Sequence, residues 1–147
     1  MQESILIEKE VTNEKGTRQF TIEAVKYFHA GDTILLYGKL GSGKTFLTRE
    51  FVKLIGSDAP VSSPSFSLIN QYEGNITINH VDFYRINNTN DLINLGLDDL
   101  WSGDCINFIE WPEIVEKQIN WQHFRIYIES CARKMEWRKF RLSRINE

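Results

Sequence analysis

The chain has 147 residues, the size of one ordinary domain, and its hydrophobic share of 41% and charged share of 25% are those of a globular protein. This composition excludes a disordered chain, and no apolar run is long enough for a transmembrane helix. The start, MQESILIEKE, lacks the basic residues and long apolar core of a secretory signal. Two cysteines cannot build a disulfide framework or a four-ligand zinc site. We therefore expect one domain over residues 1–147, in the reducing cytoplasm and without membrane contact.

The net charge of -3 excludes a chain that is basic throughout and binds nucleic acid for that reason. The charge is nevertheless uneven along the sequence. Residues 124–147 hold seven Lys or Arg against three Glu, whereas residues 86–116 hold seven Asp or Glu and no Lys or Arg. Such a split is typical of solvated faces, and a docking surface is the alternative.

Apolar periodicity predicts strands and helices in alternation, which indicates an α/β fold with a mixed, mostly parallel central sheet flanked by helices. The first half is expected to contain, in chain order, a strand at Ile5–Val11, a helix at Thr17–Ala30, a strand at Thr33–Tyr37, a glycine-rich loop at Gly38–Thr45 and a helix that ends at Ile55. The second half is expected to contain a hairpin of Phe66–Tyr72 and Ile76–Asp82, short helices within Thr89–Leu100, a buried strand at Cys105–Glu110, a helix that starts at Pro112, and a hairpin of Phe124–Glu129 and Trp137–Ser143.

The most specific signal is GKLGSGKT at residues 38–45, which fits the phosphate-loop (Walker A) pattern G-x-x-x-x-G-K-[ST] without a mismatch. Glycines let the backbone curl so that several N–H groups point at phosphate oxygens, and the following helix adds its positive N-terminal end. Lys44 supplies a mobile positive charge for the terminal phosphates, and the Thr45 hydroxyl is a ligand for Mg²⁺. An apolar strand before the loop and an amphipathic helix after it are the context that the motif requires.

Two acids follow buried strands and are candidates for the metal side of this site. Glu110 ends the near-continuous apolar run at residues 105–109, and Asp82 ends the alternating run at residues 76–82. One of them would hold the metal, directly or through water, while the other orients the attacking water. The sequence does not divide these two roles, and an ordinary acid at the end of a strand is the alternative for each.

Four further features lie around these acids. Ser62, Ser63 and Ser65 form a hydroxyl-rich loop of the kind that senses a γ-phosphate, or else a plain turn. His80 faces the same way as Asp82, and a packed, hydrogen-bonded histidine is the favoured interpretation. The pair Tyr84-Arg85 caps the strand or forms an ion pair with the acidic stretch, and Arg85 is also a candidate for contact with a partner. The aromatic Trp111, which follows Glu110, shields the site or contacts a partner, with core packing as the ordinary alternative.

Four motifs occur together in a specific order: the phosphate loop, SPSF at residues 63–66, HVDFYR at 80–85 and EWP at 110–112. In this order, and over essentially the whole chain, the sequence resembles the TsaE (YjeE) family, the small bacterial ATPases of tRNA threonylcarbamoyladenosine synthesis. The resemblance implies a single phosphate-loop ATPase domain with ATP and Mg²⁺ as cofactors. One departure stands out, because Lys39 replaces the usual acidic residue beside the phosphates.

The resemblance also implies roles for individual residues. Lys44, Asp82 and Glu110 would be catalytic, with Thr45, Glu110 and Asp82 around the metal. Residues 62–66 would form the switch-like loop, and residues 14–17 would pass near the adenine. The implied nucleotide-binding residues are Gly38, Gly41, Ser42, Gly43, Lys44, Thr45, Phe46, Thr17 and Arg138.

By the same resemblance, the chain supports the TsaB–TsaD pair, of which TsaD modifies the adenosine next to the tRNA anticodon, and it meets tRNA through that complex. Two other classes stay open: a small-molecule kinase, and a nucleotide-gated binding module. Residues 86–116 hold no Arg or Lys for the anion-closing lid of a kinase, and the two strand-end acids favour hydrolysis over binding alone. No N-K-x-D segment is present to read guanine, which favours ATP over GTP.

Overall fold

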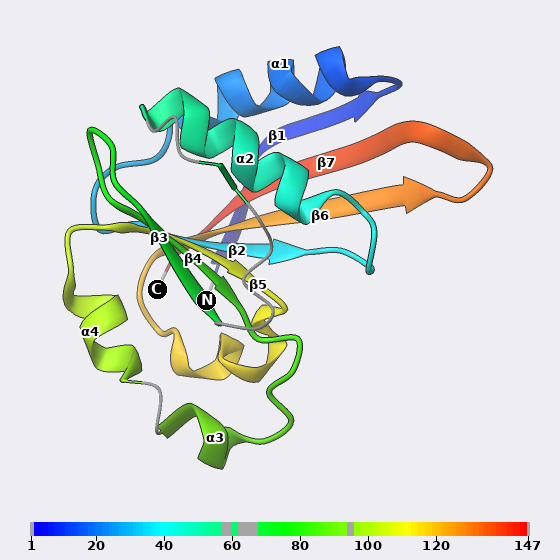
Figure 1. The fold of residues 1–147 in the computed structure, drawn as a ribbon. Coiled ribbons are helices and arrows are strands. Elements are labelled where there is room, and N and C mark those ends of the chain that lie inside the picture. The colour runs from blue at the N-terminus through cyan, green and yellow to red at the C-terminus, as the bar shows by residue number, and fades with distance from the viewer. Residues whose placement is uncertain (1, 57–59, 62–67, 94–95, 147) are drawn as a thin grey trace.

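The computed structural model describes residues 2–56, 60–61, 68–93 and 96–146 (Figure 1). Within these residues, the strands form one seven-stranded sheet in the order β1-β7-β6-β2-β5-β4-β3. The strands are β1 (Gln2–Val11), β2 (Thr33–Tyr37), β3 (Ile69–Tyr72), β4 (Ile78–Asp82), β5 (Ile106–Glu110), β6 (His123–Cys131) and β7 (Lys134–Asn146). The helices are α1 (Glu14–Val25), α2 (Lys44–Ile55), α3 (Thr89–Ile93) and α4 (Leu97–Ser102), with two 3-10 turns, η1 (Pro112–Ile114) and η2 (Glu116–Gln118).

The centre of the sheet is parallel and its outer ladders are antiparallel. Strands β6, β2, β5 and β4 run parallel to one another, whereas β3 pairs antiparallel with β4, and β7 lies antiparallel between β6 and β1. The expected mixed α/β sheet is therefore confirmed. β2 and β5 carry almost continuous buried apolar residues, as strands covered on both faces should.

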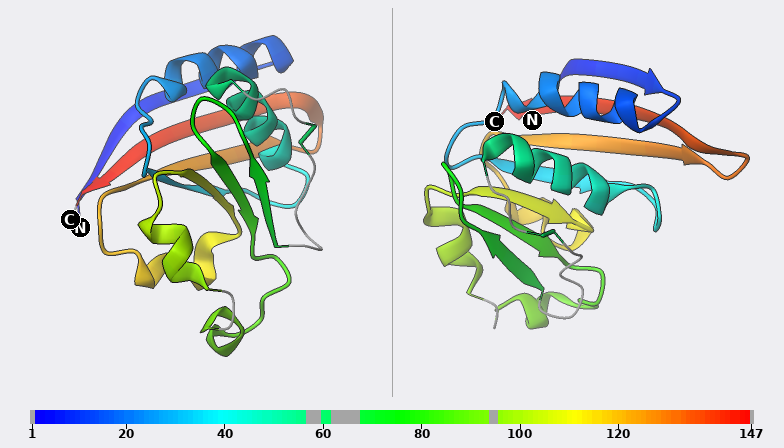
Figure 2. Two further views of the ribbon diagram at one scale, coloured as in Figure 1. Left: turned by 60° about the vertical axis from the view of Figure 1, so that its left-hand side comes forward. Right: turned by 45° about the horizontal axis from the view of Figure 1, so that its top comes forward.

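Helices cover the two faces of the sheet unequally. Figures 1 and 2 show α1 and α2 together on one face, and α3, α4 and the 3-10 turns on the other. The α1–α2 side holds a core rich in phenylalanine, in which Phe20 of α1 stacks on Phe140 of β7 with ring centroids 4.5 Å apart. The opposite side holds a smaller core that includes Leu35, Val81 and Ile109.

Two expected helices differ from those observed. Helix α1 begins three residues earlier than expected, because the Asn13 side chain caps it by accepting a hydrogen bond of 2.9 Å from the Gly16 N–H. It ends at Val25, and Phe28 turns into the core against Phe51 and Phe124. Pro112 starts only the short turn η1, and not the longer helix that we expected; the fully buried Val115 separates η1 from η2.

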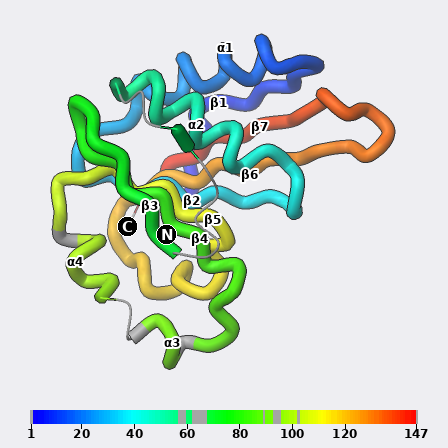
Figure 3. The backbone as a smooth tube through the Cα atoms, viewed as in Figure 1, coloured from blue at the N-terminus to red at the C-terminus, as the bar shows by residue number. Residues whose placement is uncertain are grey.

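The two ends of the described chain lie side by side, because Gln2 of β1 pairs with Asn146 of β7 (Figure 2). The β6–β7 hairpin extends well beyond the neighbouring strands (Figure 3). This hairpin carries Arg138 toward the glycine-rich loop. No helix in the described part of the chain is long and apolar enough to cross a membrane.

Candidate functional site

The glycine-rich loop lies between β2 and α2, at the carboxyl ends of the parallel strands. Glu110 ends β5 and pairs in register with Leu36 of β2, and Asp82 ends β4 and pairs with Glu110. Two acids far apart in sequence thus meet beside the loop. Ligands of open α/β sheets bind at this edge, where the carboxyl ends of the strands are found.

Gly43 and Gly38 show why the loop needs glycine. Gly43 has a φ of 105° and begins α2 without a side-chain cap, so the first N–H groups of the helix are left for another acceptor. At Gly38, an added Cβ would lie 2.5 Å from Ser42 Oγ and 3.1 Å from the Ile128 carbonyl oxygen. The loop therefore curls tightly enough to present its backbone to an anion.

Lys44, the first residue of α2, is buried and lies back against the loop. Its Nζ donates a 2.6 Å hydrogen bond to the Gly38 carbonyl oxygen and lies 3.5 Å from the centroid of the Trp111 ring. Burial lowers the pKa of Lys44, and the charges of Glu110 and Asp82 oppose that shift. The ammonium is thus held in a partly desolvated position where an anion would bind it strongly.

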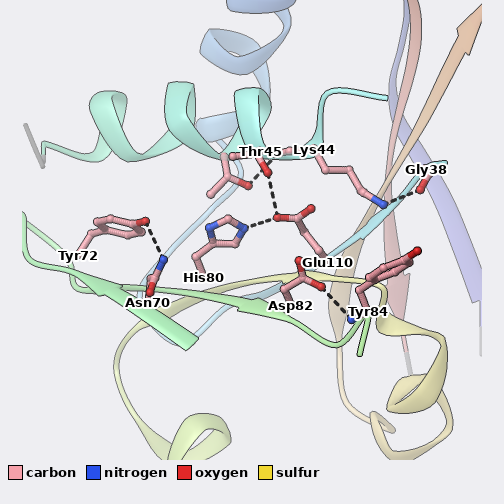
Figure 4. Close-up of polar contacts among 10 residues, drawn as sticks. Gly38, Lys44, Thr45, Asn70, Tyr72, His80, Asp82, Tyr84 and Glu110 are labelled. Atoms are coloured by element: carbon pink, nitrogen blue, oxygen red, sulfur yellow. Dashed lines mark hydrogen bonds and ion pairs between the residues drawn. The ribbon is translucent and has the colours of Figure 1, made fainter. Parts of the chain in front are cut away.

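The two strand-end acids are both 3% exposed and are held by hydrogen bonds (Figure 4). Glu110 Oε2 accepts a long hydrogen bond of 3.5 Å from Thr45 Oγ1, and it also pairs with Nε2 of His80. Asp82 Oδ1 accepts a 2.8 Å hydrogen bond from the Tyr84 N–H. The expectation that His80 is a packed, hydrogen-bonded residue on the Asp82 side is confirmed.

The donor set at this point fits Mg²⁺. Thr45, Glu110 and Asp82 offer one hydroxyl and two carboxylates, all hard oxygen donors. The described residues include no group of three or more His, Cys, Asp or Glu that would make a protein-only metal cage. Mg²⁺ is usually held by one or two carboxylates together with water and substrate phosphates, so a complete cage is not needed.

Two adjoining hollows flank the loop. One, of about 320 Å³, is lined by Gly41, Thr45, Asp82 and Glu110 among others. The second, of about 200 Å³, lies on the other side of Gly43, and its lining is Glu14, Thr17, Ser42, Gly43, Phe46, Met135, Glu136, Arg138 and Phe140. Gly43 and Phe46 line both hollows, so the two adjoin at the loop.

Arg138 connects the β6–β7 hairpin to the loop. Its Nε donates to the Ser42 carbonyl oxygen at 2.7 Å, while Nη1 donates to the carbonyls of Met135 and Trp137. Sequence reasoning did not single out Met135 or Glu136, which line the second hollow. No motif marks them, because they reach it only through the long hairpin.

The remaining candidate residues are placed as follows. Trp111 covers Lys44 and packs on Tyr84, with ring centroids 4.9 Å apart. Arg85 is exposed at the surface beyond β4. Ser62, Ser63 and Ser65 lie outside the described residues.

A larger hollow, of about 560 Å³, lies behind the loop and is lined by Tyr37, Lys39, Tyr127 and Arg141 among others. Tyr37 and Tyr127 stack on each other there, and Arg141 lies over the ring of Tyr127. Neither strand-end acid reaches this hollow. The candidate active site is therefore the hollow of about 320 Å³, which is lined by the two acids, Thr45 and Lys44.

Comparison with known proteins identifies relatives over most of the chain. Residues 11–139 match the family described as "Threonylcarbamoyl adenosine biosynthesis protein TsaE". The TsaE protein of Bacillus subtilis is 30% identical over 121 residues, which are 82% of this chain and 75% of that protein. The TsaE protein of Rickettsia felis is 35% identical over 108 residues, which are 72% of this chain and 63% of that protein.

The crystal structure of Bacillus subtilis YdiB superposes on this fold with a TM-score of 0.79 and 25% sequence identity, covering 97% of this chain and 87% of that one. The family match includes the loop, both strand-end acids and Arg138. The chain belongs to the TsaE family, whose members take part in the biosynthesis of tRNA threonylcarbamoyladenosine.

Proposed function

We propose that this protein binds ATP and Mg²⁺ at the loop of residues 38–45 and hydrolyses ATP slowly, in support of threonylcarbamoyladenosine formation by the TsaB–TsaD complex. The observation that carries the proposal is the meeting of Lys44, Thr45, Asp82 and Glu110 at one edge of the sheet. This set supplies a phosphate ligand, a metal-side hydroxyl and two acids. Bound Mg²⁺ would supply a charge that draws electrons from the terminal phosphate.

In this proposal, the phosphates, the base with its sugar, and the metal each contact a different group of residues. The N–H groups of the loop and of the start of α2 face the phosphates, and Lys44 leaves the Gly38 carbonyl to bind them. The hollow beside Thr17, Phe46 and Arg138 receives the base and sugar. Thr45 and Glu110 would hold Mg²⁺, and Asp82 would orient the attacking water.

Hydrolysis by the isolated chain is expected to be slow, because the transition state of phosphoryl transfer needs added positive charge. Arg138, the arginine beside the loop, already donates to three backbone carbonyl groups. Lys39 is exposed and outside the hollow that holds the two acids. A partner that adds or repositions a cation would complete the site.

We propose the TsaB–TsaD complex as that partner, with tRNA reached through it. Trp111 and Tyr84 form an aromatic surface at the mouth of the site, and the exposed Arg85 lies beside Tyr84. A partner seated there would contact the residues that cover Lys44. Cys105 and Cys131 are both free thiols, as is usual for proteins of the reducing cytoplasm.

The test is steady-state phosphate release from ATP and Mg²⁺ at fixed salt, with and without TsaB–TsaD. We expect a turnover for the chain alone below roughly 1 s⁻¹, the low end of the kinase range, and a changed rate when the complex is added. A panel of acceptor metabolites serves as the control for a kinase. Turnover that needs an acceptor, or a fast rate unchanged by the complex, would contradict the proposal.

A second prediction concerns Arg138. Replacing Arg138 with Met is expected to weaken ATP binding by about tenfold, because a charge-assisted contact of about 1.5 kcal/mol is lost beside the loop. Turnover at saturating ATP should change less than affinity. Calorimetric titration with ATP measures the effect.

Lys139→Met is the matched control, since it makes the same charge change one residue along β7. Lys139 pairs with Glu8 at 3.4 Å and does not line the hollow beside Gly43. Equal ATP affinity in the Arg138 variant and the wild type would exclude Arg138 from the nucleotide site.

A further inference from the structure

His80 is a polar side chain in a position that suits an apolar one. It lies in the middle of β4, is fully buried, and pairs in register with Phe108 of β5. Neighbouring core positions of this strand hold Ile78 and Val81, both fully buried. A buried imidazole at this point needs a reason beyond filling space.

Among the described residues, only one of the two ring nitrogens of His80 has a hydrogen-bond partner. Its Nε2 pairs with Oε2 of Glu110, the acid that ends the adjacent strand (Figure 4). Its Nδ1 is buried without a hydrogen-bond partner among the described residues. A buried polar atom without a partner lowers stability, so an apolar residue of similar volume would serve the core better.

The contact between His80 and Glu110 influences the orientation of the Glu110 carboxylate. Oε2 receives both described side-chain donors, Nε2 of His80 and Oγ1 of Thr45. The contact from β4 holds Oε2 and restricts rotation of the carboxylate, which limits the directions that Oε1 can face. The Thr45 hydroxyl proton is drawn to Glu110, which leaves the lone pairs of that oxygen for a cation.

From these contacts we infer that His80 is a positioning residue, which fixes the Glu110 carboxylate and, through it, the Thr45 hydroxyl for Mg²⁺. The inference rests on the proposed function, because it assumes that metal and nucleotide bind at this edge of the sheet. Replacing a residue that is hydrogen-bonded to a metal ligand commonly changes metal affinity or activity by about 10–100-fold. His80 itself lines neither of the two hollows beside the loop.

The experiment measures the affinity of the full chain for ADP by calorimetry over a series of Mg²⁺ concentrations. His80→Leu removes the donor and keeps most of the volume, and His80→Asn keeps an amide that is too short to reach Glu110. The midpoint is the Mg²⁺ concentration that gives half of the increase in ADP affinity. For both variants it is expected to be on the order of tenfold higher than for the wild type. His80→Gln, whose amide nitrogen reaches the place of Nε2, should restore a midpoint near that of the wild type.

Val81→Ala is the matched control, because Val81 is the next residue of β4, equally buried, and packs in the opposite core. It should lower the melting temperature and leave the Mg²⁺ midpoint unchanged. A wild-type midpoint in whichever of the Leu and Asn variants folds would overturn the inference, as would an equal shift in Val81→Ala. A wild type whose ADP affinity ignores Mg²⁺ would overturn the proposed metal site as well, which separates the two failures.

Discussion

Replacing Lys44 with Ala is expected to lower ATP hydrolysis by about 10²–10³-fold, the loss typical of one donor aimed at transition-state charge. ATP binding should weaken with it. The folded state should be almost unaffected, because the ammonium contacts the Gly38 carbonyl and the face of Trp111 and is no part of either apolar core. Burial lowers the pKa of Lys44, so its removal also relieves a desolvation cost.

The measurement pairs phosphate release with thermal unfolding of the same samples. Lys53→Ala is the control, since it makes the same change in the last turn of α2, where the side chain is exposed and 3.8 Å from Glu50. We expect its hydrolysis to match the wild type. Equal hydrolysis by the Lys44 variant and the wild type would reject the phosphate site.

Features that depend on short stretches of sequence could be predicted. The strand Thr33–Tyr37 has the bounds that its apolar run predicts, and α2 ends at Ile55 as expected. Placing Asp82 and Glu110 near each other needed only the rule that parallel strands share one carboxyl edge. Register then makes them direct neighbours, as observed.

Contacts that depend on long-range packing could not be predicted. The bond from His80 to Glu110 requires the stagger of β4 against β5 as well as the rotamers of both side chains. The position of Lys44 under Trp111 requires the left-handed backbone of Trp111, at a φ of 54°, which no local pattern indicates. Likewise, Met135 reaches the second hollow only because the β6–β7 hairpin is long.

The sequence alone also did not divide the metal and water roles between Asp82 and Glu110. In the structure, the two acids have different hydrogen-bond partners. Glu110 accepts from the Thr45 hydroxyl and from His80, and this contact with Thr45 favours Glu110 as the metal-side acid. Asp82 accepts from the Tyr84 N–H and lines the same hollow as Thr45. We therefore propose Glu110 for the metal and Asp82 for the attacking water.

Glu110→Gln and Asp82→Asn are each expected to reduce hydrolysis by about 10²–10³-fold, and to reduce nucleotide binding much less. The reason is that the loop N–H groups and Lys44 still hold the phosphates when one acid is neutralised. Glu110→Gln should also raise the Mg²⁺ concentration needed for half-maximal rate. Asp82→Asn should lower the rate at every Mg²⁺ concentration, because its loss leaves the water unoriented. Phosphate release over a Mg²⁺ series, with ATP affinity measured alongside, distinguishes the two patterns.

Glu113→Gln provides the control for both variants. Glu113 is exposed, lies three residues beyond Glu110, and acts on Lys44 only through its charge. Neutralising it removes a nearby negative charge without removing a group from the hollow, so hydrolysis should stay within about twofold of the wild type, as an exposed charge contributes little. If Glu110→Gln and Asp82→Asn both hydrolyse ATP at the normal rate, another acid serves the metal and the water, and the strand ends are structural.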